Sequence, residues 1–144
     1  MEKFFLLIRP FKMNDKFEVI NLWQKCKLCV PWNDPYKDIS RKMNVLPELF
    51  LVGITDGNIV ATVMGGYDGH RGWINYLAVH PKYQKNGFAR KILESLENKL
   101  KLLGCPKVNL QIRNGNNNVI SFYEKMGFID DKVINMGKRL QKDN

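Results

Sequence analysis

Residues 74–103 read INYLAVHPKYQKNGFARKILESLENKLKLL, and this stretch decides the fold. Its apolar start predicts a strand that ends at His80-Pro81, and a short polar loop then leads directly into an amphipathic helix. The helix is indicated by apolar residues that recur at helical spacing: Ala89, Ile92, Leu93, Leu96, Leu100 and Leu103.

A glycine loop between a strand and a helix can bind phosphate. The first N–H groups of a helix have no partner within the helix and lie at its positive dipole end. Gly87 has no side chain to keep a phosphate from the backbone, and Ala89 is nearly as small. A plain strand-to-helix turn is the alternative interpretation, and the loop by itself does not decide between the two.

The composition fits one globular domain over residues 1–144. Hydrophobic residues make up 44% and charged residues 26%, as in ordinary soluble domains. No apolar run approaches the ~20 residues that a membrane-spanning helix needs, and the N-terminus has no small-residue cleavage site. We therefore expect a cytoplasmic protein that does not associate with membranes.

The net charge and the cysteine content limit the kinds of partner and ligand that the chain can be expected to bind. The net charge is +9, from 23 basic and 14 acidic residues, which favours an anionic partner. The basic residues are scattered and do not interleave with aromatics, so nucleic acid is a weaker candidate than a polyphosphate cofactor or an acidic substrate. Cys26, Cys29 and Cys105 lack a second zinc-ligand pair, which predicts reduced thiols, no disulfide framework and no metal site.

The remaining elements follow from periodicity and from turn residues. Asp56-Gly57 between two apolar runs is typical of a hairpin. We expect strands over Phe4–Arg9, Leu49–Ile54, Asn58–Met64, Trp73–Val79 and Val108–Ile112, with further strand material over Phe128–Ile129 and Lys132–Met136. Besides the helix described above, we expect one capped by Asn14 or Asp15, one over Asp38–Val45, and one capped by Asn116 or Asn117 that stops at Gly127. The basic residues 137–142 are expected to fray.

Two loops are candidates for a substrate-binding site. Trp32 stands among short polar residues between Pro31 and Pro35, so it is a core plug or a pocket wall. Residues 65–72 hold four glycines, more than a turn needs, which favours backbone that bends sharply or lies close to a ligand. We expect the acceptor pocket to be lined by Trp32, Asp34, Tyr67, Asp68 and Arg71.

A resemblance to a known family joins these motifs. Gln84-x-x-Gly87-x-Ala89 after a strand is similar to the acetyl-coenzyme A loop of the GNAT (GCN5-related N-acetyltransferase) family. Residues 113–128 resemble the family pattern of an asparagine before a helix that ends in Phe-Tyr-Glu-Lys-x-Gly-Phe, although Val119 stands where alanine is usual. Longer strings, such as residues 31–35 and 63–72, resemble the YpeA subgroup.

The resemblance implies a fold and a coenzyme site. The fold is α/β, a mixed and mostly antiparallel sheet with helices on both faces and a splay between the fourth and fifth strands. The implied co-substrate is acetyl-coenzyme A, with no metal, and Asn116 bonds its pantetheine arm. The implied coenzyme-binding residues are Leu77, Ala78, Val79, Gln84, Lys85, Asn86, Gly87, Phe88, Ala89, Arg90, Asn116, Phe122 and Tyr123.

The implied chemistry is direct acetyl transfer to an amine. A main-chain N–H from Leu77 or Ala78 stabilises the oxyanion, and Tyr123 protonates the departing thiolate. Taken alone, Tyr123 is more simply interpreted as a half-buried core tyrosine, and the coenzyme loop upstream makes that interpretation less favourable. Some relatives carry a glutamate where this chain has Gln111, which can only orient a water. Asp68 is our first candidate for the base, with His70 and Asp34 as alternatives.

Three hypotheses remain open from the sequence. The first is an acetyl-coenzyme A-dependent N-acetyltransferase, the second a non-catalytic module that binds or senses acyl-coenzyme A, and the third a basic nucleic-acid-binding domain. Tyr123 together with Asn116 favours the first over the second, and the loop from Gln84 to Ala89 is not required by the third. The sequence does not name the acceptor amine, and the protein is expected to be a monomer or a homodimer.

Overall fold

The computed structural model describes residues 4–144, and its centre is one five-stranded sheet. The strands are β1 (Leu7–Pro10), β2 (Phe50–Thr55), β3 (Asn58–Tyr67), β4 (Gly72–Val79) and β5 (Val108–Leu110), and they lie in this order. All neighbouring pairs are antiparallel except β4 and β5, which are parallel. The predicted mixed, mostly antiparallel sheet is therefore confirmed.

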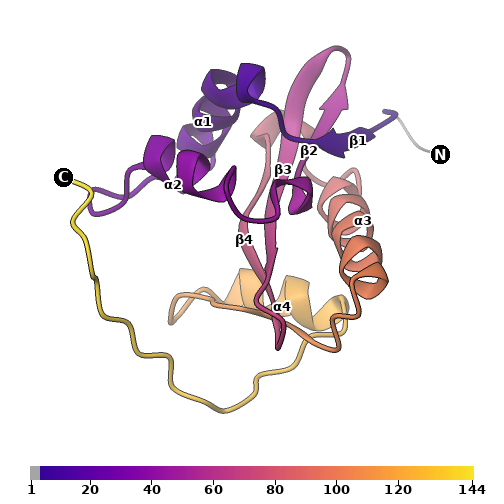
Figure 1. Cartoon of the computed structure of the whole chain (residues 1–144). Coiled ribbons are helices and arrows are strands. Elements are labelled where there is room, and N and C mark those ends of the chain that lie inside the picture. The colour runs from indigo at the N-terminus through magenta and orange to yellow at the C-terminus, as the bar shows by residue number, and fades with distance from the viewer. Residues whose placement is uncertain (1–3) are drawn as a thin grey trace.

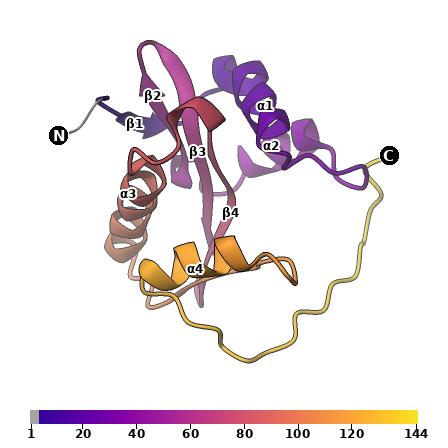
Figure 2. The same cartoon turned by 180° about the vertical axis from the view of Figure 1, so that it is seen from behind.

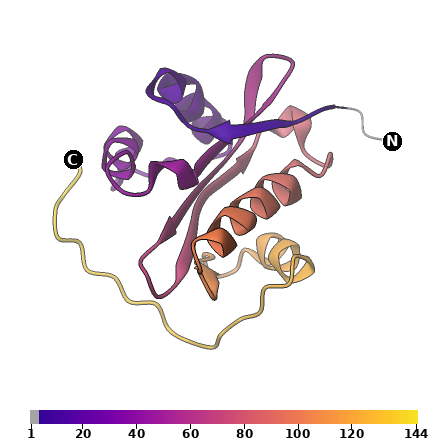
Figure 3. The same ribbon diagram turned by 45° about the vertical axis from the view of Figure 1, so that its right-hand side comes forward.

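Helices cover both faces of the sheet. They are α1 (Lys16–Lys25), α2 (Pro35–Lys42), α3 (Phe88–Leu102) and α4 (Asn117–Lys125), with short 3-10 turns η1 (Met13–Asp15), η2 (Pro47–Leu49) and η3 (Pro81–Tyr83). Figures 1 and 3 show α1 and α2 on one side of the strands and α3 on the other. The chain thus forms the layered arrangement expected from the alternation of strand and helix patterns.

Alternation along β2 and β3 explains the two cores. Successive side chains of a strand point to opposite faces, so neighbours in one apolar run enter different layers. Phe50 and Val52 pack with Trp23 of α1, whereas Leu51 and Val63 belong to the cluster that includes α3. Both faces of these strands are buried, which is why they read as continuous apolar runs rather than as alternating ones.

The surplus glycines of residues 65–72 have a packing role. β3 continues through Gly65 to Tyr67, so the loop is shorter than the sequence indicated. A Cβ on Gly65 would lie 2.3 Å from Leu96 Cδ1, and one on Gly72 would lie 2.9 Å from Cys105 Sγ. These two glycines admit α3 and its following turn against the sheet, a reason that the sequence did not indicate, whereas Gly69 has a φ of 90° and fits the expected sharp bend.

Most element boundaries differ from the sequence predictions by one to three residues, and β1 begins at Leu7 rather than Phe4. α2 begins at Pro35 rather than Asp38, because the Asp34 carboxylate accepts the Tyr36 N–H and proline fits the first helical position. β5 ends at Leu110, two residues before the expected end. Cys26 and Cys29 follow the end of α1 instead of lying within a helix, and all three cysteines are free thiols.

The C-terminal segment, residues 128–144, corrects two further predictions. Residues 128–136 form no strand: Val133 and Ile134 are 78% and 89% exposed, because a strand needs a ladder partner and β5 offers only three paired residues. The segment instead leaves α4 as an extended arc and returns to α2 (Figure 2). Its end does not fray, since Asp143 forms an ion pair with Arg41.

Candidate active site

The sheet opens between β4 and β5. Register pairs join these strands only from Gly72 to Ile74, opposite Val108–Leu110. Beyond Ile74, residues 75–79 of β4 have no partner on that side, so their outward N–H and C=O groups form an open edge. This confirms the splay between the fourth and fifth strands, and it offers main-chain partners to an extended ligand with amide groups.

A bulge lies in β4 at the start of this open edge. Thr62 pairs with Ala78 and Met64 with Asn75, so Tyr76 and Leu77 together oppose the single residue between them on β3. Tyr76 has a φ of 50°, a left-handed conformation that a tyrosine rarely adopts. Leu77 has no register partner in β3 or β5. Its N–H is therefore a candidate donor to an oxyanion, as predicted.

A buried network supports the bulge from the face covered by α1. The Trp23 Nε1–H donates to Thr62 Oγ1 over 2.9 Å, and the Thr62 hydroxyl donates to the Tyr76 carbonyl over 2.8 Å. The Trp23 and Tyr76 rings stack with centroids 3.8 Å apart. The Tyr76 hydroxyl donates to Asp38 Oδ2 over 2.6 Å, and burial together with this bond raises the pKa of Tyr76. Sequence reasoning missed these four residues because their contacts join distant parts of the chain.

The loop before α3 presents a run of free backbone donors. In the part of the chain that the structure describes, no N–H from Gln84 to Arg90 donates a hydrogen bond, and the first bond of α3 runs from Lys91 N to the Gly87 carbonyl. Lys85 and Gly87 have φ of 67° and 77°. Consecutive donors at a helix N-terminus, with left-handed backbone beside them, suit a phosphate group.

Side chains hold this loop in place. Gln84 Nε2 donates to the Val79 carbonyl over 3.2 Å, and Cys26 Sγ donates to the same oxygen over 3.3 Å. Asn86 Nδ2 donates to the carbonyls of Tyr83 and Gln84. Of these predicted coenzyme residues, Gln84 and Asn86 therefore shape the backbone with their side chains, which leaves their N–H groups for the ligand.

The predicted coenzyme-binding residues in the first turn of α3 differ in how deeply their side chains are buried. Phe88 is 2% exposed and packs with Leu6 and Val60, so its side chain is part of the core. Arg90 is exposed and lies 3.9 Å from Glu94, which leaves its guanidinium free to turn toward an anion. Ala89 takes up little space beside the loop. The predicted coenzyme contacts of these three residues therefore come from their N–H groups and from the Arg90 charge.

α4 carries the predicted tyrosine and asparagine. Asn116 occupies the N-cap position, but its side chain makes no capping bond and is exposed. Tyr123 is 8% exposed and belongs to the apolar cluster of Ile74, against which Leu77 and Val79 also pack. Its ring meets Phe122 and Phe128 edge to face, at centroid distances of 5.1 and 5.4 Å. The fold thus brings α4 and the open edge of β4 to one cluster.

The Tyr123 hydroxyl is a neutral donor. Within residues 4–144 it has no hydrogen-bond partner, and burial raises its pKa to about 12. It is therefore fully protonated at neutral pH. A phenol with a packed ring and a hydroxyl that reaches the surface without a protein partner among the described residues, beside an open strand edge, is suited to donate a proton or a hydrogen bond to a departing thiolate.

The predicted acceptor residues fall into two groups. Trp32 is half exposed and lines a cleft of about 710 Å³ together with Arg41 and residues 137–141, which include none of the other four predicted residues. Asp34 caps α2 with its carboxylate. Tyr67 and Arg71 lie in the β3–β4 turn, where the Tyr67 hydroxyl donates to the carbonyls of Gly69 and Gly104. The cleft therefore includes Trp32 but not Asp34, Tyr67, Asp68 or Arg71, so the five predicted residues do not line one pocket.

Asp68 and Gln111 are the predicted residues for proton removal. Asp68 Oδ1 accepts the N–H groups of His70 and Arg71 at 2.7 Å each, and Oδ2 accepts Trp73 Nε1–H at 3.4 Å. These backbone bonds lower the pKa of Asp68, which weakens it as a base and gives it the contacts of a turn-capping residue. Gln111 Nε2 donates to Asn135 Oδ1 over 2.7 Å.

Metal-binding groups and membrane-spanning helices are both absent from the described residues. Among residues 4–144 no three His, Cys, Asp or Glu side chains gather closely enough to hold a metal ion. Within the same range, no helix has the length and apolar character needed to cross a membrane.

Comparison with known proteins agrees with this geometry. Residues 17–128 match the model of the acetyltransferase (GNAT) family. A protein named acetyltransferase from Sodalis glossinidius is 51% identical over 137 residues, covering 94% of this chain and 96% of the relative. One from Yersinia pseudotuberculosis is 52% identical over 136 residues, with the same shares covered. The solved NatC complex bound to Gag peptide and CoA has a similar fold, with a TM-score of 0.73, 24% identity, and 86% of this chain and 84% of that chain covered.

The open strand edge, the loop of free donors and the tyrosine-bearing helix suit a ligand that carries phosphates and amides, as an acyl thioester of coenzyme A does. The chain belongs to the GNAT acetyltransferase family. It is an N-acetyltransferase whose co-substrate is acetyl-coenzyme A, and the alternative of a non-catalytic binding module is not favoured.

Proposed function

We propose that the protein transfers the acetyl group directly from acetyl-coenzyme A to the amine of a small molecule or protein, with Tyr123 as the proton donor. One observation carries this proposal: the free N–H groups from Gln84 to Arg90 lie at the end of the same strand whose open edge begins after Ile74. A ligand with phosphates at one end and amides along its arm fits both features at once.

Different groups of the chain bind different parts of that ligand. The N–H groups of the loop and the Arg90 guanidinium hold the pyrophosphate. The main chain of Leu77, Ala78 and Val79 pairs with the pantetheine amides, and the free Asn116 amide bonds the same arm. Phe122 covers it from α4. Asn116 and Tyr123 are seven positions apart, about two helical turns, so both face the arm.

The transfer step needs an oxyanion donor and a proton donor. The amine nitrogen forms a bond to the acetyl carbon, and the carbon–sulfur bond breaks. The Leu77 N–H stabilises the oxygen that becomes negative, since the bulge leaves it without a partner in either neighbouring strand. The Tyr123 hydroxyl gives its proton to the sulfur. Water takes the proton that the amine loses, ordered by the Gln111 side-chain oxygen.

Asp68 is the competing base, and one substitution separates it from Gln111. We expect Asp68→Asn to leave turnover unchanged, because the Asp68 oxygens already accept three N–H groups of its turn. The measurement is the steady-state rate with a saturating amine, next to the melting temperature. A rate loss of about 10²-fold or more, with an intact fold, would establish Asp68 as the base instead.

The acceptor side is formed by the loop before α2. Trp32 lines the cleft there, Asp34 caps α2 two residues further on, and Tyr67, Asp68 and Arg71 complete the site only if the β3–β4 turn moves toward them. The charge of +9 suits a polyphosphate coenzyme and an acidic acceptor, so no nucleic-acid partner is needed. Three free thiols suit the reducing cytoplasm, where we place the protein.

The test of this function is thiol release from acetyl-coenzyme A over a panel of primary amines. The panel includes polyamines, aminoglycosides, amino acids and peptides with free N-termini. We expect at least one class to accelerate thiol release above the rate of water hydrolysis. Intact coenzyme binding with no amine-dependent release over the whole panel would contradict the enzymatic function.

A further inference from the structure

The carboxylate of Asp143 is bound like a ligand. Its side chain is 2% exposed, although it is the next-to-last residue of the chain. Oδ1 lies 2.7 Å from Arg41 Nη2, and Oδ2 accepts the Asp34 N–H over 2.8 Å. Lys37 Nζ donates to the Asp143 carbonyl over 2.8 Å, and Arg139 lies 3.7 Å from Oδ1. The bonds from Arg41 and Asp34 lower the pKa of Asp143 to about 2.

The chain that leads to Asp143 contributes little to holding it there. Large apolar side chains along it are 78–92% exposed: Ile129, Val133, Ile134, Met136 and Leu140. Its other contacts are polar, such as Lys107 with Asp131, Gln111 with Asn135 and Arg139 with Asn33. The buried carboxylate is thus the most enclosed contact of this segment, and its partners Arg41 and the Asp34 N–H belong to α2 and its N-cap, as does Lys37, which binds the main-chain carbonyl of the same residue.

Three consecutive contacts connect this carboxylate to the active strand. Arg41, which holds Asp143, lies 3.3 Å from Asp38 Oδ1. Asp38 Oδ2 accepts the Tyr76 hydroxyl over 2.6 Å, and Tyr76 precedes Leu77 in the β4 bulge. A group bound by Arg41 is therefore joined through Asp38 and Tyr76 to the place where the acetyl group is transferred.

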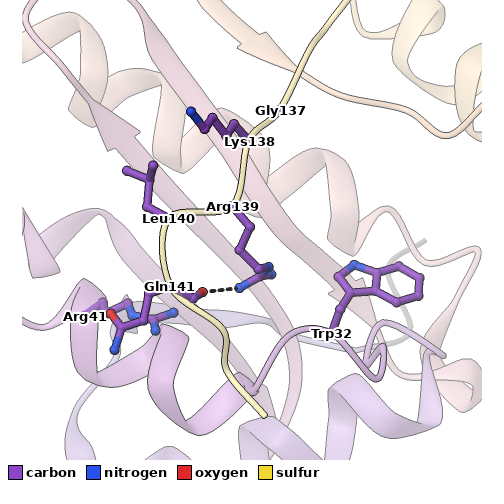
Figure 4. A pocket seen from close by; sticks show the side chains of 7 residues that line it. All are labelled: Trp32, Arg41, Gly137, Lys138, Arg139, Leu140 and Gln141. Atoms are coloured by element: carbon purple, nitrogen blue, oxygen red, sulfur yellow. Dashed lines mark hydrogen bonds between the residues drawn. The ribbon is translucent and has the colours of Figure 1, made fainter.

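An open cleft adjoins the same cation. It has a volume of about 710 Å³ and is lined by Trp32, Arg41 and residues 137–141 of the C-terminal segment. Figure 4 shows Arg41 and Trp32 on either side of that segment, with Arg139 between them. Arg113 lies over the Trp32 ring, 5.6 Å from its centroid. The cleft walls thus carry aromatic and cationic groups, which favours an anionic occupant.

We propose that Arg41 and the Asp34 N–H form a carboxylate subsite for the acceptor, and that Asp143 occupies it as an internal competitor. The acceptor class is then a small amine that also carries a carboxylate. This inference rests on the proposed function, because it assumes that the amine approaches β4 from the α2 side. An acceptor carboxylate would displace Asp143 and turn the C-terminal segment away.

The test measures binding of a matched pair of product analogues to the full chain by calorimetry. N-acetylglycine carries the carboxylate, and N-acetylglycinamide is the neutral control. We expect Asp143→Asn to tighten N-acetylglycine binding at least ~10-fold, a change of about 1.4 kcal/mol, and to leave the amide unchanged. Arg41→Gln on that background should abolish the preference for the carboxylate. Lys101→Gln removes a distant exposed charge and should change nothing.

A truncated chain and a measurement of coenzyme binding complete the test. A chain that ends at Lys142 lacks the competitor altogether and should bind N-acetylglycine as tightly as the Asp143→Asn variant does. Equal N-acetylglycine affinity in all three proteins, or no preference over the amide, would overturn the subsite. The stabilisation by acetyl-coenzyme A is measured alongside: if it persists when the carboxylate preference is absent, only the subsite fails, and if it is absent, the proposed function fails.

Discussion

Tyr123 combines burial with an unused hydroxyl. Its ring is fixed between Phe122 and Phe128, while its hydroxyl has no partner within the described residues 4–144. Packing therefore accounts for the ring but leaves the hydroxyl unexplained. The proposed proton donation gives that hydroxyl a role, and it separates the contribution of the ring from that of the oxygen.

We expect Tyr123→Phe to keep the fold and coenzyme affinity and to lower turnover by roughly 10²–10⁴-fold, the usual loss of a general acid. Because burial raises the pKa of Tyr123 to about 12, its titration should not limit the rate at neutral or mildly alkaline pH. The measurement is turnover beside acetyl-coenzyme A affinity for both proteins. Wild-type turnover with phenylalanine would return Tyr123 to a packing role.

The raised pKa of Tyr123 also makes the stability of the fold decrease at alkaline pH. The unfolded tyrosine ionises near its ordinary pKa of 10.0, whereas the folded one ionises near about 12. The contribution of the neutral phenol to the free energy of unfolding is therefore complete below pH 10 and is lost as the pH rises toward 12. The phenylalanine variant should lack this part of the alkaline decline.

At the scale of elements, the β4 bulge depends on α1. Trp23, Thr62 and the Tyr76 carbonyl form one buried chain of hydrogen bonds. It holds Tyr76 at a φ that costs on the order of 1–3 kcal/mol in a non-glycine residue. The bulge directs the Leu77 N–H, so α1 would position the proposed oxyanion donor although it lies on the opposite face from Tyr123.

We expect Thr62→Val to lower the free energy of unfolding by about 1–3 kcal/mol, since it leaves the Trp23 N–H and the Tyr76 carbonyl buried without a partner. It should also lower kcat. Thr55→Val is the control, because Thr55 is buried as well but donates only to the Phe5 carbonyl, away from the bulge. Denaturant unfolding and turnover are compared. An equal kcat loss in both variants would contradict the role of the bulge.

Local sequence signals account for much of the fold. Asp56-Gly57 predicted the hairpin, and both residues have positive φ, 51° and 77°, as the turn requires. The apolar spacing of residues 89–103 predicted α3. The start of α2 carried a readable signal too, an aspartate before a proline, which the expectation of a loop from Val30 to Pro35 overlooked. These features depend on residues that are close together in the chain.

Non-local contacts explain what could not be predicted. The bulge at Tyr76 depends on Trp23, 53 residues away by number, and no local pattern indicates it. Lys132–Met136 has the composition of a strand but lacks a ladder partner, which only the sheet edge could supply. The site residues taken from the GNAT motifs remain predictions, which the variants at Gly87 and Tyr123 test, and the resemblance to the YpeA subgroup remains a prediction too.

At the scale of the whole molecule, the proposed function has the two co-substrates meet across the sheet. It assigns Gln84–Arg90 and α4 to the coenzyme, and Trp32 and α2 to the acceptor; α2 and α4 lie in different parts of the molecule (Figures 1 and 2). The open edge of β4 is the part common to both. The account therefore depends most on whether the loop of free N–H groups binds the coenzyme.

The melting temperature with and without acetyl-coenzyme A tests this claim most directly. A coenzyme at 100 times its Kd stabilises by about 2.7 kcal/mol, which raises Tm by roughly 5–10 °C in a domain of this size. Gly87→Val should lose most of the shift. Gly57→Val is a matched control, because both glycines have a φ of 77° and open space around them. A full shift in Gly57→Val with little in Gly87→Val is the predicted result, and equal shifts in both variants would contradict the account.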